Sequence, residues 1–262
     1  MGPHQRPIVI GGGDRDLFRP SPVFLGVVAL FVTGGVMAWQ GYGNVGFDVF
    51  LFVVAGWIVS LSLHEYAHAL IAYRAGDVQV AAKGYLTLNP LRYAHPFLSI
   101  VLPVIFVLLG GIGLPGGAVW VDHHAIRNRV LDSLISLAGP ATNLLFAAIL
   151  AVPFWIGVDV GAHPGFWAGV AALGFLQLTA GILNLLPVPG LDGGNALRPW
   201  LRGDVARMFD LFAPFGLLLL FALLFEPRIR AAFFGLVSVI SEALGLPERL
   251  YGAGLDLMRF WT

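Results

Sequence analysis

The 262-residue chain contains no cysteine. This absence excludes disulfides and thiolate metal sites, so any bound metal would need nitrogen and oxygen ligands. Charge is also scarce, because Asp, Glu, Lys and Arg make up 11% of the residues, against about a quarter in soluble domains. The 15 basic and 15 acidic residues give a formal net charge of zero. No overall field therefore favours nucleic acid, and we expect no nucleic-acid partner.

Hydrophobic residues take the place of the missing charges. They make up 58% of the chain, and several apolar runs approach the roughly 20 residues that a helix needs to cross a bilayer. The sequence thus predicts an all-α polytopic protein of the lipid bilayer, with about six transmembrane helices. Its 34 glycines and 17 prolines favour close helix packing and re-entrant segments. The N-terminal region lacks the pattern of a cleaved signal peptide, so we expect the first apolar run to be an uncleaved anchor.

The apolar runs also predict how the chain is divided. Residues 1–20 are expected to form a mobile polar tail, and residues 21–262 a single membrane domain with its core over 47–200. Complete spans are expected at residues 23–39, 47–73, 132–158, 164–187 and 209–225. Residues 230–246 are less apolar, and the sequence leaves open whether they cross the bilayer or lie in its interface.

The second apolar run contains His64-Glu65-Tyr66-Ala67-His68. Histidines four residues apart on a helix share one face, so both imidazoles can bind one metal ion. Glu65 projects about 100° around the helix, beside the position of a reacting water molecule. The alternative is a pair of packed histidines next to a solvated or paired glutamate. Three ionisable groups within five residues of an apolar helix are costly, and this cost favours a metal site.

A catalytic zinc site needs a third protein ligand and an open fourth position. Asp192 lies between Pro187-Val188-Pro189-Gly190 and Gly193-Gly194, where a helix must break. By itself this pattern is typical of a turn at the membrane surface. Together with the two histidines, Asp192 becomes the best candidate for the third Zn²⁺ ligand, because carboxylates are rare near the other spans.

Residues 97–113 are apolar but contain Pro103 and several glycines. If they crossed the bilayer completely, His68 and Asp192 would lie on opposite sides of it. Both must reach one ion through bonds of about 2 Å, so we expect this segment to be re-entrant or a hairpin. The arginines of the flanking loops place the metal motif near the cytoplasmic side. One lysine among the 15 basic residues favours a GC-rich prokaryotic genome, and hence a prokaryotic cell membrane.

Two polar stretches between the spans need interpretation. Residues 77–90 contain strand-forming side chains on both sides of Gly84, which predicts two short extended pieces and hence a β-like re-entrant segment. An ordinary polar loop is the open alternative. His123 and His124 are adjacent and cannot share a helix face, so we interpret them as solvated loop residues rather than metal ligands.

Three motifs follow one another along the chain: the histidine motif at residues 64–68, Gly139-Pro140-Ala141-Thr142-Asn143, and residues 184–194 ending in Leu191-Asp192-Gly193-Gly194. Their order and membrane setting resemble the site-2 protease family of intramembrane zinc metalloproteases. The resemblance covers about residues 47–200 and is to the small prokaryotic type, without a PDZ or nucleotide-sensing domain.

This resemblance implies a role for each matching residue. His64, His68 and Asp192 would bind Zn²⁺, and Glu65 would be the general base. Asn184 and Asn143 would help to bind the substrate or its oxyanion, and Asn143 would also shape the core together with Gly139. Residues 77–88 would be the extended segment that pairs with the substrate.

The implied function is hydrolysis of a peptide bond in a membrane-embedded or membrane-proximal segment of a transmembrane protein, that is, regulated intramembrane proteolysis. A metal-ion transporter or sensor could use the same His/Asp site, but the other spans lack the repeated polar motifs of a transport path. A catalytically inactive membrane scaffold is a further alternative. The sequence specifies no oligomeric state.

Overall fold

The computed structural model describes residues 17–93, 105, 119–122, 125–126 and 128–261. Short 3₁₀ turns lie between the helices, among them η1 (Tyr85–Thr87) and η4 (Val160–Ala162). No β-strand occurs within the described residues. The helices are α2 (Pro22–Gln40), α3 (Val45–Ala75), α4 (Gln79–Ala82), α6 (Arg129–Trp155), α7 (Pro164–Asn184), α8 (Asp192–Leu197), α9 (Gly203–Phe212), α10 (Gly216–Phe225), α11 (Pro227–Ala243) and α12 (Glu248–Leu257).

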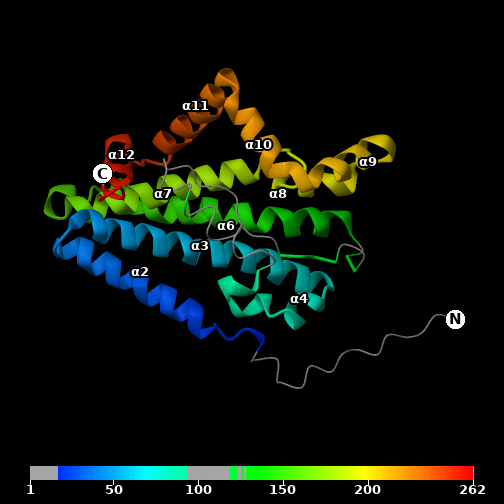
Figure 1. Ribbon diagram of the computed structural model, residues 1–262, viewed down its shortest axis with the longest axis horizontal. Helices are drawn as coiled ribbons and strands as arrows, with labels where there is room; N and C mark the ends of the chain where they lie inside the picture. The colour runs from blue at the N-terminus through cyan, green and yellow to red at the C-terminus, as the bar shows by residue number, and fades with distance from the viewer. Residues whose placement is uncertain (1–16, 94–104, 106–118, 123–124, 127, 262) are drawn as a thin grey trace.

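Four long helices, α2, α3, α6 and α7, lie side by side and form the body of the molecule (Figure 1). α3 contacts each of the other three. α7 is the most enclosed helix, since every residue from Trp167 to Asn184 is buried. Its many glycines and alanines leave room for the neighbouring backbones, which is how membrane helices commonly pack.

The helices confirm the prediction of an all-α polytopic membrane protein. Five are long and apolar enough to span a bilayer: α2, α3, α6, α7 and residues Gly203–Phe225, which include α9 and α10. The pair α11 and α12 would make a sixth, but it is bent by 113°. Residues 230–246 are therefore part of a bent pair rather than a straight span. In Figure 1, α10 and α11 form an inverted V beside the four long helices.

The prediction of a β-like segment at residues 77–90 was wrong. Asp77 Oδ1 accepts a hydrogen bond of 2.9 Å from the Gln79 N–H, and the chain then forms α4 and η1. Packing outweighed strand propensity, because the apolar residues of this segment are buried against the end of α3. The buried cluster there comprises Ala69, Ala72, Val80, Ala81, Tyr85, Leu86, Tyr93 and Ile135.

Apart from Ile105, the apolar segment at 97–113 lies outside the described residues, so its predicted re-entrant course does too, as do residues 1–16 and the histidine pair at 123–124. The ends of the connection from α3 to α6 are nevertheless defined. The Asp122 N–H donates a hydrogen bond of 2.8 Å to Asp77 Oδ2, so this connection starts and ends at the same end of the bundle. That is the condition that a shared site for His68 and Asp192 requires.

Residues 17–20 are not detached from the domain, unlike the mobile tail that the sequence predicts. The Phe18 ring meets the Tyr73 ring edge to face, with a centroid distance of 6.0 Å, and Leu17 packs against the cluster at the end of α3. The Ser21 N–H also donates a hydrogen bond of 2.8 Å to the Thr87 carbonyl. The start of α2 is thereby fixed to the segment after α3.

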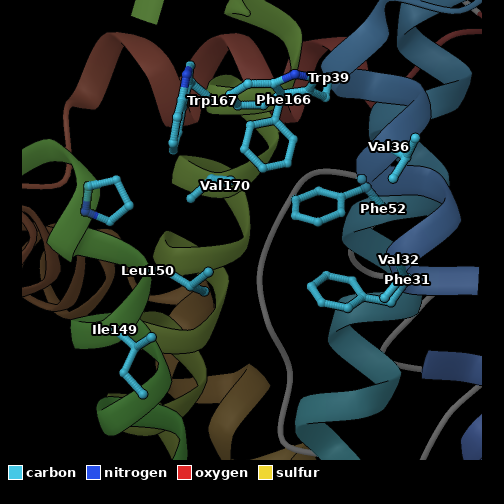
Figure 2. Close-up of a pocket in the computed structure, with 12 residues that line it drawn as sticks. Phe31, Val32, Val36, Trp39, Phe52, Ile149, Leu150, Phe166, Trp167 and Val170 are labelled. Carbon is cyan, nitrogen blue, oxygen red and sulfur yellow. The ribbon is translucent and has the colours of Figure 1, made fainter. Parts of the chain in front are cut away.

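An apolar cavity of about 530 Å³ lies between α2, α3, α6 and α7 (Figure 2). Aromatic and aliphatic side chains line it, among them Phe31, Phe52, Leu150 and Phe166, and the lining contains no titratable group. Phe52 precedes His64 on α3 by about 18 Å of helix. The cavity suits hydrocarbon and lies away from the histidine motif, so it is not the candidate reaction site.

Candidate metal centre

The histidine motif lies in the C-terminal half of α3, a helix of 31 residues. The helix is defined at both ends, since Asn44 caps its N-terminus and Gly76, with φ of 118°, ends it in a left-handed conformation. His64, Glu65 and His68 are buried, with 4%, 2% and 7% of their surfaces exposed. A helix of this length carries all three groups into the interior of the bundle.

Three ligand atoms meet at this position. The Nε2 atoms of His64 and His68 are 3.1 Å apart. Asp192 Oδ2 lies 3.2 Å from the first and 3.5 Å from the second. Tetrahedral zinc, with bonds of about 2.0–2.1 Å, places its ligand atoms about 3.3 Å apart. The three edges of this triangle therefore fit one zinc ion, with a fourth position left over.

Asp192 reaches the histidines because α8 turns tightly against the end of α7. A Cβ built on Gly193 would lie under 3.0 Å from the Leu185 carbonyl, and one on Gly194 equally close to the Val188 carbonyl. Only glycine permits these contacts, and they hold Asp192 as the first residue of α8. Burial raises the pKa of the Asp192 carboxyl, but the adjacent imidazoles outweigh this effect and lower the pKa below its usual range.

The other ring nitrogen of each histidine faces an oxygen. His68 Nδ1 lies 2.6 Å from the Ile135 carbonyl, and His64 Nδ1 contacts Asn143 Oδ1. A carbonyl can only accept, so His68 carries its proton on Nδ1 and leaves the Nε2 lone pair free for a metal. Hydrogen bonds of this kind are typical of metal-binding histidines.

Gly139 of α6 leaves the space that an ion would need. A Cβ built on Gly139 would lie under 3.0 Å from the Nε2 atoms of both His64 and His68. Every other residue type would thus occupy the space where the two ligand nitrogens converge. The ligand chemistry, the spacing and this opening together fit a tetrahedral zinc ion.

Glu65 lies beside the triangle rather than in it. Its Oε2 accepts a hydrogen bond of 3.0 Å from the Val119 N–H, which orients the carboxylate.

Tyr93 donates a hydrogen bond of 2.9 Å to the Ser62 carbonyl. Burial raises the pKa of the Tyr93 phenol, and the neighbouring Glu65 carboxylate raises it further, so the phenol remains neutral.

Asn143 and Asn184, the two predicted substrate or oxyanion residues, occupy different surroundings. Asn143 is buried on α6, where it contacts His64 and donates a hydrogen bond of 2.7 Å to Gln177 Oε1. Asn184 is the last residue of α7 and is also buried. Among the described residues, no hydrogen bond joins its side chain to the three ligand residues.

Several residues of this centre are not predicted by the sequence. Val119 and Tyr93 carried no signal, because a backbone N–H and a single tyrosine in a loop form no motif. Gln177 could have been found, since it is a polar residue in the middle of the apolar span Pro164–Asn184. Such residues are expensive in a membrane and often functional.

Comparison with known proteins identifies close relatives. "Putative zinc metalloprotease Rip2" of Mycobacterium tuberculosis is 47% identical over 254 residues, which cover 95% of this chain and 97% of that protein. The Rip2 of Mycolicibacterium smegmatis is 46% identical over 255 residues, covering 95% and 96%. "Putative zinc metalloprotease YwhC" of Bacillus subtilis is 29% identical over 185 residues, covering 67% and 81%. No protein-family model and no solved structure matches the chain.

Proposed function

Because this chain belongs to the zinc metalloprotease family of Rip2, we propose that it is an intramembrane zinc peptidase of the site-2 protease type. Its substrate would be a transmembrane protein, cleaved at a peptide bond within or close to the bilayer. The observation that carries this proposal is the triangle of ligand atoms next to Glu65, in which His64 and His68 are buried in a membrane helix and Asp192 meets them from the start of α8.

In this proposal the residues divide the chemistry between them. His64, His68 and Asp192 would hold zinc, which when bound lowers the pKa of water and polarises the scissile carbonyl. Glu65 accepts a proton from the attacking water as the new carbon–oxygen bond forms. It then delivers this proton to the amide nitrogen as the carbon–nitrogen bond breaks. The Val119 N–H holds Glu65 Oε2 in place, which leaves the other oxygen for proton transfer.

The substrate must be unwound before cleavage, since the carbonyl groups of a transmembrane helix are hydrogen-bonded within it. We propose that residues 119–122 align the unwound segment by backbone pairing, the role that the family resemblance implies for residues 77–88. Their position supports this, because the Val119 N–H donates a hydrogen bond to the Glu65 carboxylate and the Asp122 N–H donates one to the Asp77 carboxylate. The Trp120 ring is also held, with Lys83 Nζ 3.7 Å from its centroid.

Asp77→Ala is expected to raise KM about tenfold with a smaller change in kcat, because it removes two hydrogen bonds that hold residues 119–122 and α4. Asp77→Asn keeps one acceptor oxygen but places an NH2 group against the other N–H, so it loses one of the two hydrogen bonds and should raise KM less than Asp77→Ala does. The measurement is steady-state cleavage of a fluorogenic apolar peptide in detergent micelles.

Asp159→Ala is the matched control for Asp77→Ala. Asp159 makes the same kind of turn, accepting a hydrogen bond of 2.9 Å from the Gly161 N–H, but it is exposed and lies in the turn between α6 and α7. It should leave KM unchanged. Equal effects of the Asp159 and Asp77 substitutions on KM would contradict a specific role for residues 119–122.

The metal centre is expected near the cytoplasmic side of the membrane. Arg74 lies in the last turn of α3, Arg129 begins α6, and Arg202 and Arg207 precede and lie in α9. These parts of the helices lie at the end of the bundle that carries the metal centre (Figure 1), which is the arrangement that the positive-inside rule favours. A reporter fused after Asp122 should therefore give a cytoplasmic signal. A signal from the opposite side of the membrane would overturn this orientation. A reporter fused after Gly157, beyond the other end of α6, is the control and should give a signal from the side opposite to the cytoplasm.

The proposed function is tested with the full chain in liposomes that also contain a transmembrane model substrate. We expect fragments of the model substrate to form when zinc is present and not to form when a chelator has removed the zinc. Zinc flux into the liposomes without any cleavage would instead identify a transporter. The natural substrates would then be sought as fragments that differ between cells with the wild-type chain and cells with Glu65→Gln.

A further inference from the structure

A chain of buried hydrogen bonds leads from His64 into α7 and back to α3. Asn143, which contacts His64 Nδ1 through Oδ1, donates from Nδ2 to Gln177 Oε1 at 2.7 Å. Gln177 donates from Nε2 to Ser60 Oγ at 2.6 Å. Ser60 in turn donates to the Trp57 carbonyl at 2.8 Å. Three helices, α3, α6 and α7, thus contribute to one connected polar path.

This path is buried deeply enough to need an explanation. Gln177 is fully buried, and Ser60 and Asn143 are 6% and 4% exposed. Polar side chains in a membrane interior are costly unless all their groups are paired, and a connected network is stable only when every member is satisfied. Here every side-chain nitrogen and oxygen along the path has at least one partner.

The far end of the path decides the direction of every bond in it. The Trp57 carbonyl can only accept, so the Ser60 hydroxyl donates to it and must accept from Gln177 Nε2. Gln177 Oε1 then faces Asn143 as an acceptor, so Asn143 must donate to it from Nδ2. Asn143 Oδ1 is left facing His64, so the proton of that imidazole must be on Nδ1.

We infer that Gln177, supported by Ser60, is a positioning residue that sets the tautomer of His64 through Asn143 and so keeps Nε2 free for the metal. The inference rests on the proposed zinc site. His68 needs no such chain, because the Ile135 carbonyl fixes its tautomer directly. If the path ran in the opposite direction, Asn143 would donate to Nδ1 and the proton would move to Nε2, which would block coordination.

The test compares zinc affinity in variants of the full chain, measured by competition with a chelator in detergent micelles. Gln177→Leu should weaken zinc binding about tenfold, the lower end of the effect of losing such a supporting hydrogen bond. Ser60→Ala should weaken it less. Gln177→Glu should retain the affinity, because either form of its carboxyl group can accept from Asn143 Nδ2.

A spectroscopic readout separates this role from packing alone. With ¹⁵N-labelled histidine and before zinc is added, His64 of the wild type should give the signals of the Nδ1–H tautomer. Gln177→Leu should give a mixture of both tautomers, whereas Gln177→Glu should resemble the wild type.

Thr179→Val is the matched control, since Thr179 is also fully buried on α7 and its hydroxyl bonds only within the helix, to the Phe175 carbonyl at 2.8 Å. It should change neither the zinc affinity nor the tautomer. Unchanged zinc affinity in Gln177→Leu would overturn the inference. So would a loss of zinc affinity in Thr179→Val or Gln177→Glu as large as that in Gln177→Leu. Neither readout requires cleavage, so failure of the proposed proteolysis would be seen separately.

Discussion

Replacing Glu65 with glutamine is expected to slow peptide-bond cleavage by at least about 10²–10⁴-fold, the usual contribution of a positioned general base. Glutamine has nearly the same shape and can still accept the hydrogen bond from the Val119 N–H, but it cannot take a proton from water. Since Glu65 lies beside the ligand triangle and not in it, zinc should remain bound. Cleavage of a transmembrane model substrate and the zinc content of the purified protein measure the two effects.

Glu242→Gln provides the control for Glu65→Gln. It makes the same chemical change at an exposed position on α11, and both cleavage and zinc content should equal those of the wild type. If Glu65→Gln lost its zinc, the carboxylate would have to be reassigned as a ligand. Cleavage at the wild-type rate would remove Glu65 as the base altogether.

Gly139→Ala is expected to reduce zinc affinity by more than the 10- to 100-fold that is typical of changes around a metal ligand. The new methyl group would lie under 3.0 Å from the Nε2 atoms of His64 and His68, in the space where an ion would bind. Both histidines would have to move away from Asp192, which breaks the triangle of ligand atoms. Cleavage should be lost together with the zinc.

Gly139→Ala should not prevent folding, because the preference of about 1 kcal/mol for alanine over glycine within a helix offsets much of the roughly 1–3 kcal/mol that displacing the two imidazoles costs. Zinc-free stability of the variant, measured by thermal unfolding in detergent, should thus be close to that of the zinc-free wild type. Gly26→Ala on α2 is the control, since a Cβ there would have nothing within 4 Å, and it should keep both zinc and activity. Normal zinc binding in Gly139→Ala would show that the ion does not lie between the two histidines and α6.

Two features of the protein depend on residues that are near one another in the chain, and the sequence predicts both of them well. The positions of His64, Glu65 and His68 on one turn depend only on the helical repeat. The spans of α2, α3, α6 and α7 depend on runs of apolar residues, and their predicted ends agree with the structure to within about three residues, as is usual for element boundaries. Asp192 was chosen by chemical elimination, and the structure brings it to the two histidines.

The segment after α3 shows where local reasoning failed. Its strand-forming residues predict extended pieces, yet Val80, Tyr85 and Leu86 are buried in helical turns against α3. Propensity for a strand is small compared with the gain from burying such side chains. The segment next to Glu65 is instead residues 119–122, which no local pattern distinguishes.

By itself, then, the sequence determined the membrane class of this protein, its main spans, and a metal motif that cysteine-free chemistry had to complete with an oxygen ligand. Only the tertiary structure decided that Gly139 clears the metal position, that Val119 holds Glu65, and that Gln177 and Ser60 lie behind His64. The physical reason is the range of the interactions. Helical periodicity and hydropathy act between near neighbours in the chain, whereas these contacts join residues of different helices that meet only when the helices pack.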